Sequence, residues 1–216
     1  MTGRSSAKAH ATRARILEAA RRELGRDPDS SLGDIAEAAG VARRTLYEHF
    51  AGRAALVQGL TADAGEAVRR ASAVARAPTP DAVTALAHVV LTLWPVGDRY
   101  RMLIALAHRD LGPDRVGALL GPARDAVAGI LAHGQRQGVF HTVLPPGPLG
   151  RALEAHVLAL LDSVNSRLWT DDGTVAATAA LIAMGVGPDL AATTVQRLRP
   201  SRLIPVDSHL IPVDSR

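Results

Sequence analysis

The pattern of apolar and polar positions along the chain predicts helices from one end to the other. Ala and Leu dominate, alternating apolar and polar runs are short, and aromatic residues make up only 3% of the sequence. These features favour an all-helical fold over one that contains strands. The expected helices span residues 9–25, 32–39, 43–49, 53–76, 80–95, 98–109, 122–137, 148–169, 173–185 and 189–198.

Turn and capping residues mark several of these boundaries. The segment 25–28 contains glycine and proline and should end the first helix. Ser31 followed three residues later by Asp34 resembles a capping box at the start of the second helix. Gly40 supplies a tight turn before the third helix. The segment 144–148 contains three prolines, and it predicts a loop.

The clearest break in composition lies at residues 76–80, and we place a domain boundary there. Thr79 is expected to cap the next helix and Pro80 to occupy its first turn. The expected parts are an N-terminal helical domain at 9–57, a connecting helix at 58–77, a larger helical domain at 78–199, and a flexible tail at 200–216. The tail repeats the string LIPVDS, and the proline in each copy excludes a heptad coiled coil.

Residues 31–56 carry the pattern of a helix-turn-helix motif. Two short helices joined through Gly40 have apolar residues where the motif needs a buried inner face. Ala36 is small enough to let the two helices cross closely. The expected inner face consists of Leu32, Ile35, Ala36, Ala39, Val41, Leu46 and Phe50.

The outer face of the second short helix carries Arg43, Arg44, Thr45, Tyr47, Glu48 and His49. Two arginines at the start of a helix oppose its dipole, at a cost of ~0.3–1 kcal/mol. Ala42 stands where a serine or threonine cap would help. Local rules that are broken together on an exposed face indicate a functional surface. Arginine can pair with the O6 and N7 atoms of guanine in the major groove, and the other side chains suit phosphates or thymine methyl groups.

At these residues the sequence closely resembles the tetracycline-repressor (TetR) family. The string IAEAAGVARRTLYEHF, followed by Arg53 and Leu56, is similar to the DNA-binding signature of that family. The upstream string TRARILEAA at 12–20 is similar to its first helix. Ala42 departs from the usual serine or threonine, and Arg53 stands where lysine is commoner. The resemblance covers residues 9–57.

The resemblance implies a homodimeric transcriptional repressor that binds a palindromic double-stranded operator and is released by a small-molecule effector. The expected DNA-binding residues are Arg43, Arg44, Thr45, Tyr47, His49 and Arg53. The resemblance also implies dimerisation through the last two long helices. The expected interface residues are Leu153, Val157, Leu160, Leu161, Val164 and Leu168. The same apolar stripe would also suit an ordinary amphipathic core helix.

The effector is expected to bind between helices of the C-terminal half, where an apolar wall and a few polar groups can form a pocket. Scarce aromatic residues can line such a pocket, although core packing is their commoner role. The expected ligand-binding residues are Trp94, Tyr100, Met102, Leu103, Leu106, Leu131 and His156. The expected hinge is the contact between the helix at 53–76 and the helix at 98–109.

Charge and composition narrow the remaining possibilities. The formal charge is +4, and the first 22 residues hold six basic side chains against one acidic one, which suits a polyanionic partner. No apolar run is long enough for a membrane span, and the chain has no cysteine. We therefore expect a cytoplasmic protein with no membrane partner, no cofactor and no metal site.

Two other classes of function compete with a ligand-responsive regulator: an enzyme, and a DNA-binding protein without an effector. The sequence lacks GxSxG, GxxxxGK[ST] and a GxGxxG on a strand-to-helix turn, so we do not expect an enzyme. The alternative that stays open is a DNA-binding protein without an effector, which would be an architectural protein or a constitutive regulator. Residues 78–216 exceed what dimerisation alone needs, which favours a sensor.

Overall fold

The computed structural model describes residues 2–75, 79, 81–106 and 113–199. Within these ranges the chain forms helices and no β-strand, which confirms the predicted all-helical fold. The helices are α1 (Thr2–Arg26), α2 (Leu32–Ala38), α3 (Arg43–His49), α4 (Arg53–Ala75), α5 (Ala82–Arg99), α6 (Met102–Leu106), α7 (Pro113–Arg136), α8 (Pro146–Asn165), α9 (Thr174–Ala183) and α10 (Pro188–Leu198). The predicted tail at 200–216 lies outside the described residues.

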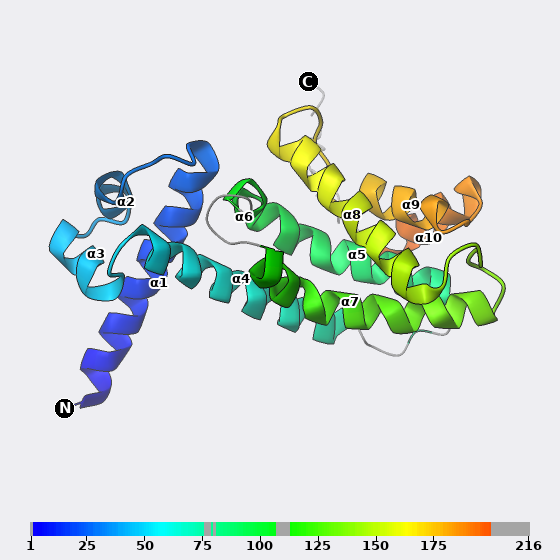
Figure 1. The fold of residues 1–216 in the computed structure, drawn as a ribbon, viewed down its shortest axis with the longest axis horizontal. Helices are drawn as coiled ribbons and strands as arrows, with labels where there is room; N and C mark the ends of the chain where they lie inside the picture. The colour runs from blue at the N-terminus through cyan, green and yellow to red at the C-terminus, as the bar shows by residue number, and fades with distance from the viewer. Residues whose placement is uncertain (1, 76–78, 80, 107–112, 200–216) are drawn as a thin grey trace, which may run out of the picture.

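The molecule is elongated, with a small head of helices α1 to α3 at one end and a larger body of α5 to α10 at the other (Figure 1). Helix α4 belongs to both parts: it packs on α1 in the head and on α5 and α7 in the body. Helices α9 and α10 lie at the end of the body that is far from α3, and α8 runs from there back toward α6. A movement of α4 would therefore be felt in both parts.

The buried core of the head has the composition that the sequence predicts. Ile35, Ala36, Leu46 and Phe50 are buried in it, while Leu32, Ala39 and Val41 pack against it partly exposed. Three residues of α6 join the same core from the body, namely Met102, Leu103 and Leu106. The head is thus tied to the body by apolar packing as well as by the continuous helix α4.

The capping box of α2 is confirmed. Ser31 Oγ accepts a hydrogen bond from the Asp34 backbone N–H at 3.2 Å, and Asp34 Oδ2 accepts one from the Ser31 N–H at 3.0 Å. Gly40 has a φ of +62° in the turn that follows. Helix α3 then begins after Ala42 with no side-chain cap. The expected helix at 43–49 is therefore present with its expected bounds.

Several helix ends in the body differ from those predicted. Helix α5 is capped by Asp81, whose side chain accepts a hydrogen bond from the Thr84 N–H at 2.7 Å, and not by Thr79. Pro80 lies outside the described residues. Helix α5 also continues through Pro95 to Arg99, since this proline removes only one backbone hydrogen bond and lies on the exposed side of the helix.

Prolines begin the next two long helices earlier than expected. Helix α7 starts at Pro113 and contains Pro122, which was expected to be its first residue. Helix α8 starts at Pro146, inside the predicted loop. A proline is tolerated in the first turn because its missing N–H has no helical partner there. Helix α8 ends at Asn165, before the expected end at Trp169.

None of the described helices combines the length and the apolar character that crossing a membrane would require.

Candidate DNA-binding surface and ligand cavity

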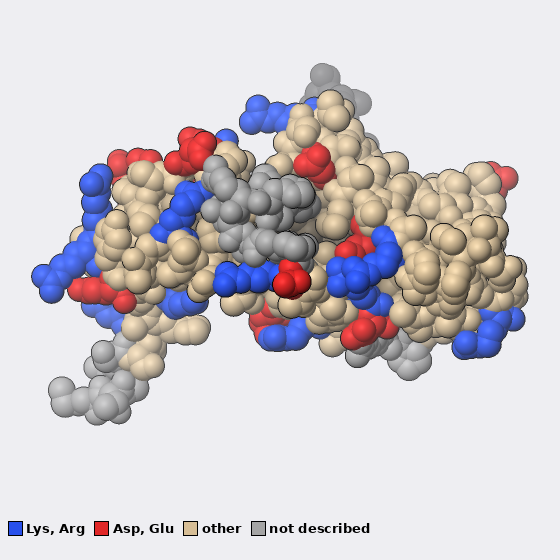
Figure 2. All heavy atoms as spheres, in the orientation of Figure 1, with Lys and Arg blue, Asp and Glu red and all other residues tan. Residues whose placement is uncertain are grey.

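The outer face of α3 is presented to solvent at the end of the head. Leu46 is fully buried beneath it, which fixes the orientation of the helix. The side chain of Arg44 is 91% exposed and Tyr47 is 54% exposed. Arg44 Nε lies 3.2 Å from Glu48 Oε1, one turn further along α3. In Figure 2, Lys and Arg side chains project from this end of the molecule, where Figure 1 places α3.

Arg43 is held against α2. A Cβ atom built on Gly33 would lie 2.7 Å from Arg43 Nη2, so the guanidinium covers the backbone of the first turn of α2. The pKa of the neighbouring Asp34 is lowered, chiefly by its hydrogen bonds with Ser31 and to a lesser extent by the positive charge of Arg43. Arg43 therefore lies at the contact between the two helices of the motif, whereas Arg44 projects away from it.

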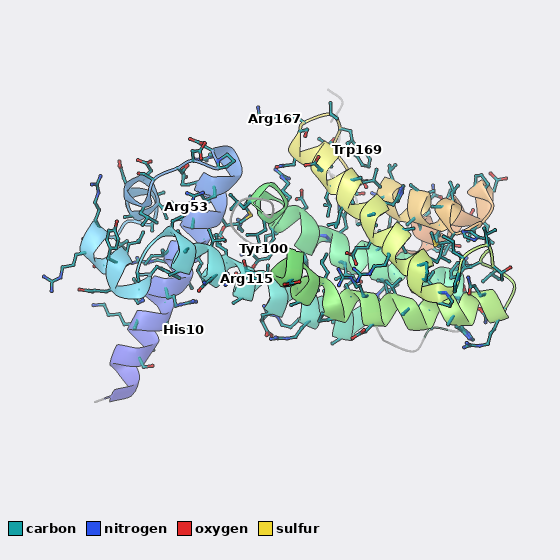
Figure 3. The ribbon with its side chains drawn as sticks, viewed as in Figure 1. His10, Arg53, Tyr100, Arg115, Arg167 and Trp169 are labelled. Atoms are coloured by element: carbon teal, nitrogen blue, oxygen red, sulfur yellow. The ribbon has the colours of Figure 1, made fainter. Side chains whose placement is uncertain are left out.

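Arg53 ties the start of α4 to the loop before α2. Its guanidinium donates hydrogen bonds to the carbonyl oxygens of Ser30, at 3.2 Å, and Pro28, at 2.5 Å. Figure 3 shows Arg53 within the head. Thr45 and His49, the other two predicted DNA-binding residues, are partly buried on α3. Five of the six predicted residues therefore lie on α3. The sixth, Arg53, lies at the contact between the start of α4 and the loop before α2.

The end of α3 is fixed by a close approach of α4. A Cβ atom on Gly59 would lie 2.7 Å from the Phe50 ring and 3.1 Å from Leu17, so only glycine fits there without displacing them. The guanidinium of Arg13 on α1 also packs on Phe50, with its Cζ atom 5.0 Å from the centre of the ring. The sequence alone does not predict the contact between Arg13 and Phe50, because it depends on how α1 crosses α4.

A cavity of 870 Å³ lies in the body between α4, α5, α7 and α8. Its wall is mainly aliphatic, and Trp94 and Tyr100 contribute aromatic surface. Among the described lining residues, the charged side chains are Asp114, Arg124, Arg151 and Glu154. An apolar wall with a few polar groups is the composition of a small-molecule site.

Three of the seven predicted ligand-binding residues line this cavity, namely Trp94, Tyr100 and Leu103. Met102 and Leu106 are instead buried in the head core, and Leu131 in the core of the body. His156 lies on α8 outside the lining, and its Nε2 atom is buried without a hydrogen-bond partner.

Residues predicted for the dimer interface also line the cavity: Leu153, Val157 and Leu161. The stripe on α8 therefore faces into the protein along much of its length. Arg124 and Glu154, which pair across the cavity wall, were missed by the sequence analysis. Their pairing follows from the packing of α7 on α8, and no local sequence signal predicts it.

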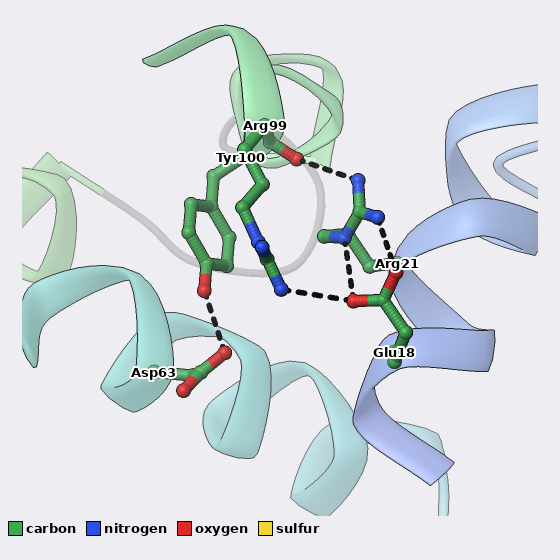
Figure 4. A network of polar contacts seen from close by, with 5 residues as sticks. All are labelled: Glu18, Arg21, Asp63, Arg99 and Tyr100. Carbon is green, nitrogen blue, oxygen red and sulfur yellow. Dashed lines mark hydrogen bonds and ion pairs between the residues drawn. The ribbon is translucent and has the colours of Figure 1, made fainter. Parts of the chain in front are cut away.

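The head meets the body at five polar side chains, Glu18, Arg21, Asp63, Arg99 and Tyr100, which we call the junction network (Figure 4). Tyr100 donates a hydrogen bond from its hydroxyl to Asp63 Oδ2 on α4 at 2.6 Å. Arg99 lies 3.0 Å from Glu18 on α1, and Arg21 donates to the Arg99 carbonyl oxygen at 3.3 Å. Glu18 and Arg21 are paired at 2.5 Å.

Tyr100 is the member of the junction network that reaches the ligand cavity. One ring therefore forms part of the cavity wall and also bonds to α4. Burial raises the pKa of Tyr100 to about 12, with a further contribution from the hydrogen bond to Asp63. The hydrogen bond from Arg21 lowers the pKa of Glu18 despite its partial burial, so the ion pairs of the network persist at neutral pH.

Comparison with known proteins agrees with this geometry. Residues 16–60 match the family of bacterial regulatory proteins, tetR family. None of the curated proteins matches the chain. The N-terminal part is thus a tetR-family domain, and regulators of this family bind DNA and are not enzymes.

Solved structures extend the likeness to the whole fold. PfmR, a TetR-family transcriptional regulator from Thermus thermophilus, is 22% identical, with 80% of this chain and 95% of that chain covered and a TM-score of 0.64. CprB from S. coelicolor A3(2) is 19% identical, with 88% and 97% covered and a TM-score of 0.70. RolR in complex with resorcinol is 23% identical, with 90% and 98% covered and a TM-score of 0.57. The chain as a whole has the fold of the TetR-family transcriptional regulators.

The environment of Tyr100 can be tested by titration. Tyr47→Phe leaves Tyr100 as the one tyrosine of the chain, so phenolate absorbance after a rapid pH jump reports on it alone. We expect a midpoint at about 12, and a lower midpoint after Asp63→Asn, because the negative charge that favours the protonated phenol is gone.

The direction of the linked stability change follows from the raised pKa. The folded value exceeds the unfolded value of about 10, so the contribution of Tyr100 to folding is complete below pH ~10 and is lost as the pH rises through about 12. An Asp63→Asn midpoint equal to that of the parent would contradict the contribution of the Asp63 charge to the Tyr100 pKa.

Proposed function

We propose that the protein is a ligand-responsive transcriptional repressor, which binds a palindromic operator as a homodimer and leaves it when a small molecule occupies the body cavity. The observation that carries the proposal is that one side chain, Tyr100, both lines the cavity and donates a hydrogen bond to Asp63 on α4. Helix α4 in turn packs on α1 and holds the end of α3 through Gly59. A ligand that moves Tyr100 would therefore act on the recognition helix.

The DNA is read by α3. Arg44 and Tyr47 project from it into solvent and are the side chains placed to reach base edges in a major groove. Arg43 and Arg53 are held close to the backbone of the motif, where they can serve phosphate contacts as well as the packing of α2 and α4. Two such heads in a two-fold dimer would bind half-sites separated by about one helical turn or a multiple of it.

The dimer forms through the outer faces of α8 and α9. Leu153 and Leu161 were predicted for the interface but are buried within the protomer. The proposed interface on α8 instead uses the opposite face of the helix, where Ala155 and Ala159 are exposed. Val175 and Ile182 are 56% and 43% exposed, and because they are seven residues apart on α9 they lie on one face of the helix. Leu168, a predicted interface residue, is exposed beyond the end of α8. Figure 2 shows few charges over the end of the body that holds these helices.

The effector acts by binding one conformation of the body better than another. A ligand shifts an equilibrium only through its differential affinity for the two states, so it must favour an arrangement of α4 in which the heads no longer match the operator. The solved complex of RolR with resorcinol shows that a protein of this fold accommodates a small molecule. The cavity supports a sensor over the architectural alternative, because its mainly aliphatic wall with a few polar groups is the composition of a small-molecule site.

Selection of binding sites from a random DNA library at near-physiological salt tests the DNA-binding part of the proposal. We expect enrichment of a palindrome, with Arg44→Ala weakening binding to it by about 10- to 100-fold, which corresponds to one lost base contact. Arg136→Ala, an exposed arginine at the end of α7, is the matched control and should bind as the parent does. Salt-sensitive binding to every sequence, without enrichment, would instead favour the architectural alternative.

The proposed interface is tested by placing a charge on it. Ile182→Glu should raise the dimer dissociation constant about 100-fold or more in sedimentation measurements, because the carboxylate would be buried without a partner. Leu190→Glu on α10 is the control, since Leu190 is 52% exposed and lies outside the α8–α9 face. A dimer unaffected by Ile182→Glu would place the interface elsewhere.

The role of Tyr100 in release is tested with a ligand obtained from a thermal-shift screen. Tyr100→Phe keeps the ring on the cavity wall and removes the hydroxyl that bonds to Asp63. We expect the ligand to stabilise this variant as it does the parent. Its effect on operator affinity should be smaller than in the parent by about tenfold, which is the effect of one hydrogen bond to a charged group. Full release by the ligand in Tyr100→Phe would show that the signal takes another route.

A further inference from the structure

The charges around the ligand cavity cancel. Among the described residues that line it, Asp114 and Glu154 supply two negative charges, and Arg124 and Arg151 supply two positive charges. With Tyr100 set aside, all the other described lining residues are apolar or glycine. A charged ligand would therefore enter a largely apolar space in which the described residues offer no surplus of the opposite charge.

Arg124 and Glu154 form the most ordered polar feature of the wall. Arg124 on α7 donates from Nη2 to Glu154 Oε1 on α8 at 2.8 Å, and from Nε to Glu154 Oε2. Both oxygens of the carboxylate are therefore bonded to the guanidinium. Arg124 Nη1 also donates to the Gly117 carbonyl oxygen at 3.0 Å. Both side chains are largely buried, with 24% and 20% of their surface exposed.

The Arg124–Glu154 pair can still form hydrogen bonds with a ligand. A guanidinium has five N–H donors, and three of those of Arg124 are used in these contacts. The carboxylate oxygens of Glu154 retain lone pairs. The pair can thus donate to a carbonyl oxygen, or both donate to and accept from a hydroxyl, without being broken. Breaking it for an ionic ligand would leave one partner as an uncompensated charge, which is costly in a partly buried site.

We propose that the cavity binds an uncharged, mainly aliphatic molecule whose one polar group, such as a hydroxyl, ketone or lactone oxygen, is hydrogen bonded by the Arg124–Glu154 pair. The proposal rests on the proposed function only in taking this molecule to be the effector. The volume of 870 Å³ lies in the range of about 300–1,000 Å³ that is usual for sites of drug-sized ligands.

The proposal is tested with three probes of equal chain length and different charge: decan-1-ol, decanoate and decylammonium. Binding is followed by tryptophan fluorescence, because Trp94 lines the cavity and the other tryptophan, Trp169, has its ring centre 6.4 Å away. We expect the alcohol to bind at least about tenfold more tightly than either ion. Octan-1-ol should bind about 15-fold more weakly than decan-1-ol, which is about fourfold for each methylene group removed from the aliphatic contact.

Reciprocal variants identify the pair as the polar site. Glu154→Gln leaves Arg124 with an unpaired positive charge and should raise the affinity for decanoate at least about tenfold, whereas Arg124→Gln should do the same for decylammonium. Glu37→Gln on α2 and Arg136→Gln on α7 change the net charge equally at exposed positions outside the cavity, and should leave the preference for the alcohol unchanged.

An exchanged pair, Arg124→Glu with Glu154→Arg, keeps the wall neutral and should also keep the preference for the alcohol. If a single variant does not fold, as judged by loss of its helical circular dichroism signal, the exchanged pair provides the test in its place. Equal binding of decanoate and decan-1-ol by the parent would overturn the proposal, as would no fluorescence change with any probe. So would an exchanged pair that prefers an ion, or the same probe affinities in Glu154→Gln and Glu37→Gln.

The outcome separates the ligand class from the proposed function because the fluorescence measurement contains no DNA. A preference for the alcohol in a protein that selects no operator would contradict the proposed function alone. Operator selection by a protein that binds all three probes equally would contradict the ligand class alone.

Discussion

The structure depends on helix α4 being buried on two sides at once. Its first turns place Leu56 and Leu60 in the core of the head, and its later turns place Val68 in the wall of the cavity. Asp63 lies between these two regions and accepts the hydrogen bond from Tyr100. Since protein cores are close-packed and resist compression, a helix shared by two of them cannot shift in one without straining the other. This constraint makes a cavity in the body relevant to a DNA-binding surface in the head.

The two short helices of the head could be predicted from sequence, because local chemistry determines them, whereas α1 begins at Thr2 and not at residue 9. The capping box at Ser31 fixes the start of α2, and the spacing of Ile35 and Leu46 fixes which faces are buried. What the sequence could not provide is the direction of side chains at helix contacts. Arg43 and Arg44 are adjacent and alike in the sequence, yet one lies against Gly33 and the other projects from α3.

The body was predicted less well, because tertiary packing overrides the local signals there. Pro95 and Pro122 mark breaks in the sequence, but each lies inside a helix whose apolar face is held by its neighbours. The stripe on α8 was ambiguous for a similar reason: an apolar face predicts burial without saying against what. Leu153 and Leu161 are buried within one protomer, so the proposed dimer interface uses the small residues on the opposite face of α8. The Arg124–Glu154 pair joins two helices and has no signature in either.

A cavity whose described charges cancel also suits a switch that depends on only a few interactions. A ligand that packs against the mainly aliphatic wall gains affinity from the apolar surface that both partners bury. A ligand with a net charge would add a desolvation cost and would compete for the Arg124–Glu154 pair that holds α7 to α8. An uncharged ligand can leave that pair intact and act on the part of the wall that is free to respond. The ring of Tyr100 is such a part, because its link to α4 is one hydrogen bond between a hydroxyl and a carboxylate. In the proposed mechanism, the strong ion pair keeps the body together while the weaker contact transmits the signal.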